Sequence, residues 1–325
     1  MSDTADRGTG ARVQPEEIAA TSALIRRLTH AVEQAVEVRP GLLDQLLTCV
    51  LAEGHVLIED LPGVGKTTLA RALARSLGLQ FARVQCTADL LPADVVGTNI
   101  YNRREERFEF RPGPIFANVV VIDEINRASP KTQSGLLECM QERRVTVDVH
   151  SHELARPFVV LATQNPIEFE GTYPLPEAQV DRFMARISLG YPSAAAEADM
   201  LRAHESRDRV EDVAAAAGPG ELLAAQDAAR RVVTSDALRA YVVALLGRTR
   251  EDSRTQLGAS PRAGLMLLRA AKARALLQGR DHALPDDVQA LARIVLAHRL
   301  VLAAEAVDVD PDTIVDDAVR AVPAL

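Results

Sequence analysis

A glycine-rich stretch, "DLPGVGKTT" at residues 60–68, constrains the fold of this chain more than any other part of the sequence. It follows a short apolar run at residues 55–60 and precedes a segment at residues 66–78 whose apolar positions have helical spacing. Glycines let backbone N–H groups turn inwards, and the start of the following helix adds a positive end. Strand, loop and helix in this order are typical of a phosphate-binding loop.

Two side chains of the loop suit particular roles. Lys66 would neutralise oxygens of the β- and γ-phosphates, and Thr67 would offer its hydroxyl to Mg²⁺. Asp60 stands where the general pattern has its first glycine. Because the N–H groups that cradle phosphate belong chiefly to residues 63–68, we expect the Asp60 carboxylate to point away from the nucleotide. The predicted nucleotide-binding residues are Asp60, Leu61, Pro62, Gly63, Val64, Gly65, Lys66, Thr67 and Thr68.

Polar residues also end two later apolar runs. The run "VVVIDE" at residues 119–124 closes with Asp123, which would hold Mg²⁺ through water, and Glu124, which would polarise the attacking water. Asn165 ends the run at residues 157–165 and could hold that water or the γ-phosphate. Ligands of open parallel sheets bind where the strands end. Taken singly, each pattern also fits a strand that leaves the core, or a turn before proline.

Two arginines stand at positions that a nucleotide would explain. In "SPR" (260–262), Ser260 is a predicted N-cap and Arg262 lies in the first helical turn, where a cation opposes the helix dipole by about 0.3–1 kcal/mol. A nearby phosphate would offset this unfavourable interaction. Alternatively, Arg262 is an exposed arginine with a partner on the protein surface. For Arg182, in "LPEAQVDRF" (175–183), the γ-phosphate of a nucleotide on a neighbouring subunit would give a reason, and without it this residue is only a surface charge.

The order of the apolar runs predicts the fold class. Strand and helix patterns alternate up to about residue 192, which indicates a parallel sheet covered by helices on both faces. Further on, the chain is rich in Ala, Leu and Arg with helical periodicity. We therefore predict a disordered tail at 1–14, an α/β nucleotide-binding core at 15–192 and an all-α domain at 193–325. Residues 145–154 alternate like a hairpin, and residues 214–222 read as a loop.

Composition argues against several classes of protein. A net charge of −8, 3% aromatic residues and no Trp argue against a nucleic-acid surface. No apolar run is long enough to cross a bilayer, and residues 1–17 lack the apolar core of a signal peptide. Three scattered cysteines (Cys49, Cys86 and Cys139) predict buried free thiols in a reducing compartment, so the cytoplasm is expected.

Four longer motifs resemble those of AAA+ ATPases, and specifically the MoxR family. They are "EDLPGVGKTT" (59–68), "FEFRPGPIFANVVVIDEINRASPKTQSGLLECMQERRVTVD" (108–148), "ATQNPIEFEGTYPLPEAQVDRF" (162–183) and "GASPRA" (258–263). The central block is the most specific of them, and residues 108–117 resemble an insert within the second helix that marks this branch.

This resemblance implies roles for the residues above. Residues 57–68 correspond to Walker A, and Asp123 and Glu124 to Walker B. Asn165 corresponds to sensor 1, Arg182 to an arginine finger that acts in trans, and Arg262 to sensor 2. The implied ligands are ATP and Mg²⁺, and the all-α segment would be the AAA+ lid.

The resemblance further implies a chaperone-like, ring-forming ATPase, often hexameric, that acts on a protein client together with a von Willebrand factor A domain protein. Two alternatives are a motor that acts on nucleic acid and a nucleotide-gated scaffold without useful hydrolysis. A magnesium-chelatase-like motor subunit is a close relative of the leading hypothesis.

Overall fold

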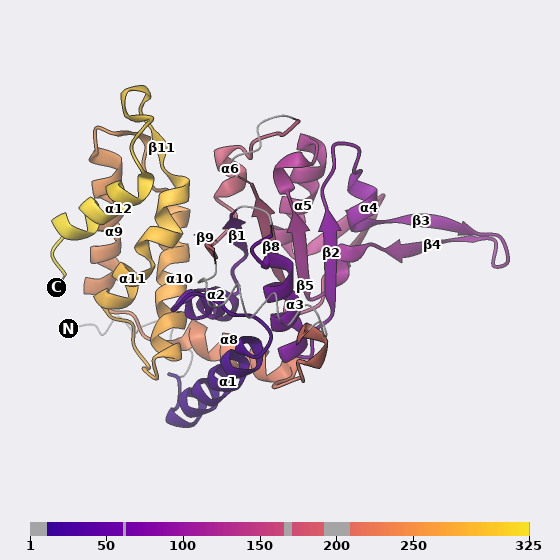
Figure 1. Cartoon of the computed structure of the whole chain (residues 1–325), viewed down its shortest axis with the longest axis horizontal. Helices are drawn as coiled ribbons and strands as arrows, with labels where there is room; N and C mark the ends of the chain where they lie inside the picture. The colour runs from indigo at the N-terminus through magenta and orange to yellow at the C-terminus, as the bar shows by residue number, and fades with distance from the viewer. Residues whose placement is uncertain (1–11, 61–62, 166–170, 192–208, 325) are drawn as a thin grey trace, which may run out of the picture.

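The computed structural model describes residues 12–60, 63–165, 171–191 and 209–324. Its centre is a parallel five-stranded sheet in the order β2-β5-β8-β1-β9, with helices on both faces (Figure 1). This arrangement confirms the predicted fold class. The strands are β1 (Val56–Glu59), β2 (Phe81–Gln85), β5 (Val119–Asp123), β8 (Val159–Gln164) and β9 (Ala185–Ile187).

Alternate residues of each central strand enter two separate apolar cores, because successive side chains of a strand point to opposite faces. Val119 and Val121 of β5 face one core, whereas Val120 and Ile122 face the other. Helices α1 (Pro15–Glu33), α2 (Leu42–Leu51) and α3 (Lys66–Ser76) belong to the first core, and α4 (Pro92–Val96) and α5 (Pro130–Glu142) to the second. Both faces of β1, β5 and β8 are covered, which explains why these strands are largely apolar, whereas the edge strand β2 is partly exposed.

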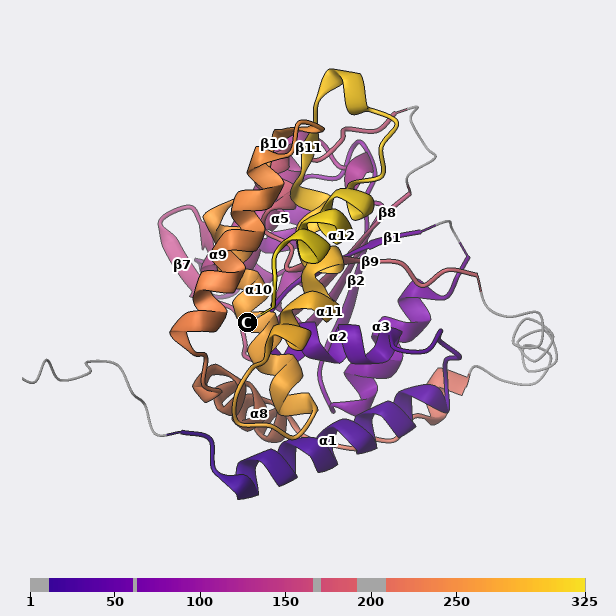
Figure 2. The ribbon, with the colours of Figure 1, turned by 90° about the vertical axis from the view of Figure 1, so that its left-hand side faces the viewer.

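The C-terminal helices pack around α10 (Pro261–Leu277), which contacts α1 and α2 of the sheet domain as well as its own neighbours. Figure 2 shows α1 running beneath α8 and α10. Many α10 residues are alanines that are fully buried, so neighbouring helices approach closely. The other helices of this region are α8 (Pro219–Arg231), α9 (Asp236–Glu251), α11 (Pro285–Leu296) and α12 (Pro311–Ala321).

Two details of this region differ from the sequence expectation. The predicted loop at 214–222 is wrong in its second half, because α8 begins at Pro219 and Glu221 caps it by accepting a hydrogen bond from the Gly218 amide. A small antiparallel pair, β10 (Thr255–Leu257) and β11 (Val301–Leu302), lies among the helices. The proposed boundary at 192/193 and residues 1–11 of the proposed tail lie outside the described residues.

An arm projects from the sheet domain (Figure 1). It is the antiparallel hairpin of β3 (Gly97–Asn102) and β4 (Arg107–Pro112), followed by a 3₁₀ turn at Pro114–Phe116. At its base Gly113 passes so close to α4 that a Cβ there would lie 2.2 Å from the Val95 carbonyl oxygen. The arm therefore needs glycine where it leaves the body.

The second hairpin, β6 (Arg144–Val147) and β7 (His150–Glu153), confirms the predicted alternation. The His152 ring stacks on Phe110 of the arm with a centroid distance of 3.9 Å, so this histidine has a packing role. In the described ranges no group of three or more His, Cys, Asp or Glu residues could hold a metal ion. Cys49, Cys86 and Cys139 are buried and free, as predicted.

No helix in the part of the chain that the structure describes combines the length and apolarity needed to span a bilayer. The remaining short elements are α6 (Glu177–Val180) and 3₁₀ turns at Ile125–Arg127, Arg209–Asp212, Ala297–Arg299 (η4) and Ala304–Ala306.

A buried histidine joins three elements at the start of β1. The His55 Nδ1 atom accepts a hydrogen bond from the Val160 amide (3.0 Å), and its Nε2 lies 3.0 Å from the Met140 carbonyl oxygen. The ring is therefore neutral with its proton on Nε2. Burial lowers the pKa of His55 to about 4.

We predict that the free energy of unfolding falls as the pH drops from about 6.5 towards 4. The unfolded chain takes up a proton on His55 near pH 6.5, whereas the folded chain does so only near pH 4, at a cost of about 3 kcal/mol. Urea unfolding of wild type and His55→Gln at pH 7 and 4.5 measures this difference. Equal pH dependence of both proteins would contradict it.

Candidate functional site

The predicted phosphate-binding loop lies between β1 and α3. Gly63 and Gly65 both have φ near +87°, a conformation that favours glycine, and Gly65 is the residue before α3. Lys66, Thr67 and Thr68 form the first turn of α3, where backbone N–H groups are free of intrahelical partners. Leu61 and Pro62 lie outside the described residues.

Lys66 is held inside this loop. Its Nζ donates a hydrogen bond of 2.8 Å to the Asp60 carbonyl oxygen. Burial lowers the pKa of Lys66, and the carboxylates of Asp60, Asp123 and Glu124 oppose that shift. A half-buried ammonium group that has one backbone partner keeps two N–H donors for phosphate oxygens.

The Asp60 carboxylate points towards β9. It accepts hydrogen bonds from the Ser188 hydroxyl (2.8 Å) and from the amides of Leu189 and Gly190. The Asp60 carboxylate therefore points away from the phosphate-binding loop, as the sequence predicts. This carboxylate holds the exit of β9 against the end of β1.

Asp123 is the centre of a polar cluster at the end of β5. Its Oδ2 lies 3.4 Å from the Thr67 hydroxyl, and its Oδ1 accepts a hydrogen bond of 3.2 Å from Thr163 on β8. Arg83 of β2 also donates to Oδ2 over 2.5 Å, so a cation already balances this buried carboxylate. Thr67 and Asp123 supply adjacent hard oxygen ligands, which is the donor set that suits Mg²⁺.

Glu124 adopts a strained backbone, with φ of +55° in a residue other than glycine. Its amide donates to the Thr163 hydroxyl (3.0 Å). Its carboxylate accepts from Gln85 (3.1 Å) and pairs with Arg127 (3.1 Å). These contacts aim the carboxylate across the edge of the sheet.

The sequence interpretation missed Arg83, Gln85, Thr163 and Arg127. One signal could have found two of them, because Gln85 and Thr163 are polar residues at or near the C-terminal ends of parallel strands. Asn165 directly follows β8 and is half-buried at this same edge.

Arg262 lies at a different place, beside the residue that precedes Arg182 in the sequence. Arg262 lies at the start of α10, and its Nε is 3.8 Å from an oxygen of Asp181, the residue before Arg182. Within the described ranges, Asp181 is the ion-pair partner of Arg262, and no side-chain hydrogen bond or ion pair joins Arg182 to another residue.

This second site is remote from the first along the sheet. The Met184 amide donates to the His55 carbonyl oxygen (2.8 Å), and Ala185 pairs with Val56. The predicted phosphate-binding loop follows Asp60, which is five residues after His55, and five residues of extended chain span about 16 Å. The structure thus divides the predicted residues into a loop group and an arginine group.

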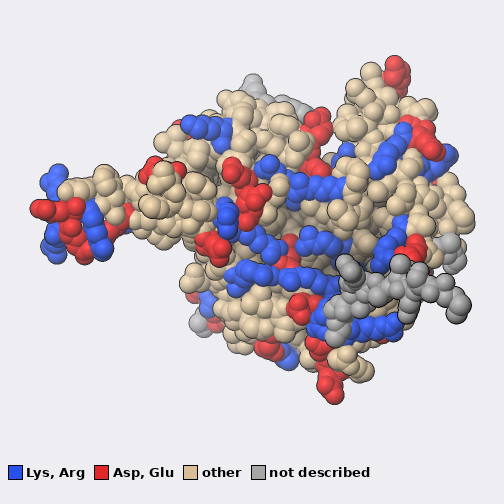
Figure 3. Space-filling view, turned by 180° about the vertical axis from the view of Figure 1, so that it is seen from behind, with Lys and Arg blue, Asp and Glu red and all other residues tan. Residues whose placement is uncertain are grey.

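A second group of charged residues lies on another face of the molecule. Lys and Arg side chains form a band across the face opposite to that of Figure 1 (Figure 3). Three arginines, Arg143, Arg156 and Arg230, pair with the buried Glu53 carboxylate just before β1.

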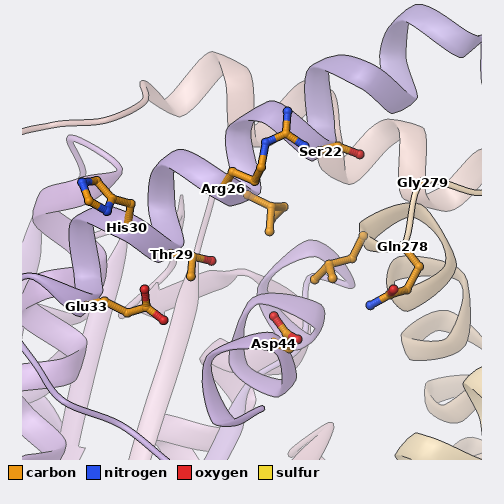
Figure 4. A pocket seen from close by; sticks show the side chains of 10 residues that line it. Ser22, Arg26, Thr29, His30, Glu33, Asp44, Gln278 and Gly279 are labelled. Carbon is orange, nitrogen blue, oxygen red and sulfur yellow. The ribbon is translucent and has the colours of Figure 1, made fainter. Parts of the chain in front are cut away.

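A cleft of about 510 Å³ opens between α1, α2 and the end of α10, and Arg26, His30 and Asp44 line it (Figure 4). Its described lining contains none of the predicted nucleotide-binding residues.

Comparison with known proteins gives consistent matches. Residues 55–185 match the family described as "ATPase family associated with various cellular activities (AAA)", and residues 247–318 match the AAA lid domain. The chain is 49% identical to the uncharacterized protein YeaC of Bacillus subtilis (86% of this chain, 88% of that protein). It is 39% identical to chaperone MoxR1 of Mycobacterium tuberculosis (94% and 84%). A crystal structure of a candidate ATPase from Cytophaga hutchinsonii is 38% identical, with a TM-score of 0.89 and coverage of 95% and 97%.

We predict that Asp60→Ala lowers the free energy of unfolding by about 1–3 kcal/mol, because the buried Leu189 amide and the part-buried Ser188 and Gly190 donors lose their acceptor. Nucleotide affinity of the folded protein should change little, since the carboxylate points away from the loop. Urea unfolding and titration with a fluorescent ATP analogue measure the two effects. A large gain in affinity would show instead that the carboxylate repels phosphate.

Proposed function

The chain belongs to the MoxR family of AAA+ ATPases, and we propose that it is a Mg²⁺-dependent ATP hydrolase that works as a cytoplasmic ring, typically of six subunits. Hydrolysis would remodel, mature or activate a protein client, together with a partner that carries a von Willebrand factor A domain. The separation of the loop group from the arginine group within one subunit is the observation that carries this proposal.

That separation favours catalysis between subunits. Lys66, Thr67 and Asp123 meet at the C-terminal edge of the sheet, whereas Arg182 precedes the start of β9. A side chain cannot span the intervening ~16 Å. A head-to-tail ring brings the arginine group of one subunit to the loop group of the next.

The residues of the loop group have distinct roles in this proposal. Lys66 and the amides of residues 63–68 bind the phosphates, and Glu124 accepts a hydrogen bond from the attacking water while Asn165 orients that water. Mg²⁺, held by Thr67 and Asp123, would balance charge on the β- and γ-phosphates. Arg182 and Arg262 of the neighbour would stabilise the charge that develops on the γ-phosphate.

The projecting arm is the proposed contact for the client. Tyr101 is 50% and Phe108 71% exposed, and their rings meet edge to face with a centroid distance of 5.3 Å. Burying these exposed apolar side chains against a protein surface is favourable, because it removes apolar area from water. The arm is therefore suited to an unfolded or partly folded protein.

A nucleic-acid motor is less well supported by the same arm. Its tip mixes both signs of charge, and Arg107 is paired with Glu105 and Glu109. The exposed Arg103 and Arg104 of the tip are followed directly by Glu105 and Glu106, so the tip as a whole offers little net attraction to a phosphate backbone. Stimulation of ATP hydrolysis by DNA would favour that alternative, and a chelatase assay would test the magnesium-chelatase-like one.

We predict that Arg182→Ala and Glu124→Gln each lose ATP turnover, by about 10³–10⁵ for the arginine. A mixture of the two proteins should regain activity, because random rings place an intact Arg182 opposite an intact Glu124 at about one interface in four. Steady-state phosphate release before and after mixing measures this. The proposal would be contradicted if the Glu124→Gln variant did not bind ATP, or if the mixture of the two variants stayed inactive.

We also predict that Tyr101→Ser/Phe108→Ser abolishes client capture. In the Glu124→Gln background, which would hold ATP and therefore client, the double variant should retain no client in a pull-down. Turnover without client, measured in the Glu124-intact background, should stay within about twofold, since the arm is remote from the loop group. Val149→Ser, at the tip of the other hairpin and 85% exposed, is the matched control. Capture of the same clients by the double variant would exclude the arm as the contact.

A further inference from the structure

Asp181 joins the segment that carries Arg182 to two parts of the helical region. Its Oδ1 accepts a hydrogen bond of 2.8 Å from Arg299 Nε and one of 3.4 Å from the Ser260 hydroxyl. Its Oδ2 lies 3.8 Å from Arg262 Nε. One carboxylate thus connects the start of α10, the turn η4 and the α6–β9 segment.

Arg299 holds both neighbours of Arg182. Its guanidinium donates to the Asp181 carboxylate and also to the carbonyl oxygens of Phe183 and Met184. The Arg299 side chain is only 2% exposed, and Phe183 is fully buried. Arg182 therefore projects from a segment that is fixed on either side, while its own side chain is half-buried.

Arg262 is held less tightly than Arg299. Its ion pair with Asp181 is long, at 3.8 Å, and its side chain is 39% exposed. A long and partly hydrated ion pair is weak, so a phosphate dianion can displace the carboxylate from Arg262. The Arg299–Asp181 bond is short and shielded, so it persists when that happens.

We propose that Asp181 and Arg299 are a positioning pair, which holds Arg182 and Arg262 as one cationic clamp for the γ-phosphate bound by the neighbouring subunit. This inference rests on the proposed function, in which both arginines act between subunits. Asp181 keeps Arg262 beside Arg182 before the nucleotide arrives and releases it to the phosphate. Arg299 keeps the clamp aligned with the helical region, so that movement of α10 also moves Arg182.

The test is complementation in mixed rings. Asp181→Asn should lower kcat of the homogeneous ring by roughly 10- to 100-fold, because small displacements of a catalytic group have effects of that size. Nucleotide affinity should stay unchanged, since the variant keeps its own loop group. Mixing Asp181→Asn with Glu124→Gln should restore turnover, because the Glu124→Gln subunit supplies an intact clamp to the intact Glu124 of its neighbour.

The matched control is Asp287→Asn. Asp287 is buried and pairs with Arg274 and Arg280 at the far end of α10. The Asp287→Asn variant should have a lower thermal unfolding midpoint. It should not show the loss of kcat that mixing with Glu124→Gln subunits restores. If Asp181→Asn does not assemble, Arg299→Lys, which keeps the charge and loses the multiple contacts, is measured in the same way.

Three outcomes separate the two proposals. An inactive mixture of Arg182→Ala with Glu124→Gln overturns catalysis between subunits. An active mixture of that pair, combined with an Asp181→Asn ring that keeps full kcat, overturns only the positioning role. An Asp181→Asn loss that Glu124→Gln subunits do not rescue also overturns it, because the defect then lies in the variant's own loop group.

Discussion

Parallel pairing of β1 with β8 on one side and β9 on the other is the constraint on which the rest of the structure depends. It brings the ends of β1 and β8 to one edge of the sheet, beside the end of β5, and it leaves the start of β9 at the other. Asp60 reinforces this pairing by accepting hydrogen bonds from the residues after β9. Both halves of the proposed site therefore have fixed places within a single subunit.

Electrostatic balance follows the same division. At the loop edge, Arg83 and Arg127 lie against the carboxylates of Asp123 and Glu124. At the start of β9, Asp181 lies against Arg262. In the proposed function, Mg²⁺ would take the place of an arginine beside the carboxylates, and a phosphate would take the place of Asp181 beside Arg262. Ligand binding would then exchange one charged partner for another and would leave no charge unpaired.

The order of residues along the chain predicted most of the fold and the elements that carry the loop group. The strand before Gly63, the helix after Gly65 and the acids that end β5 are recognisable because adjacent residues carry the signal. Arg83 and Thr163 escaped because their importance depends on neighbouring strands that are distant in sequence. The start of α8 and the small β10–β11 pair escaped because capping contacts and tertiary packing decide them.

The sequence by itself determined a parallel α/β sheet, a glycine-rich loop between a strand and a helix, and an acid pair at a strand end, since periodicity and chain order suffice to specify each of them. Only the tertiary structure decided where Arg182 and Arg262 lie. The two arginines are 80 positions apart in the sequence. Packing of α10 and η4 against the start of β9 brings Arg262 to Asp181, the residue beside Arg182. Local pattern carries no information about that distance, because buried contacts between remote segments fix it.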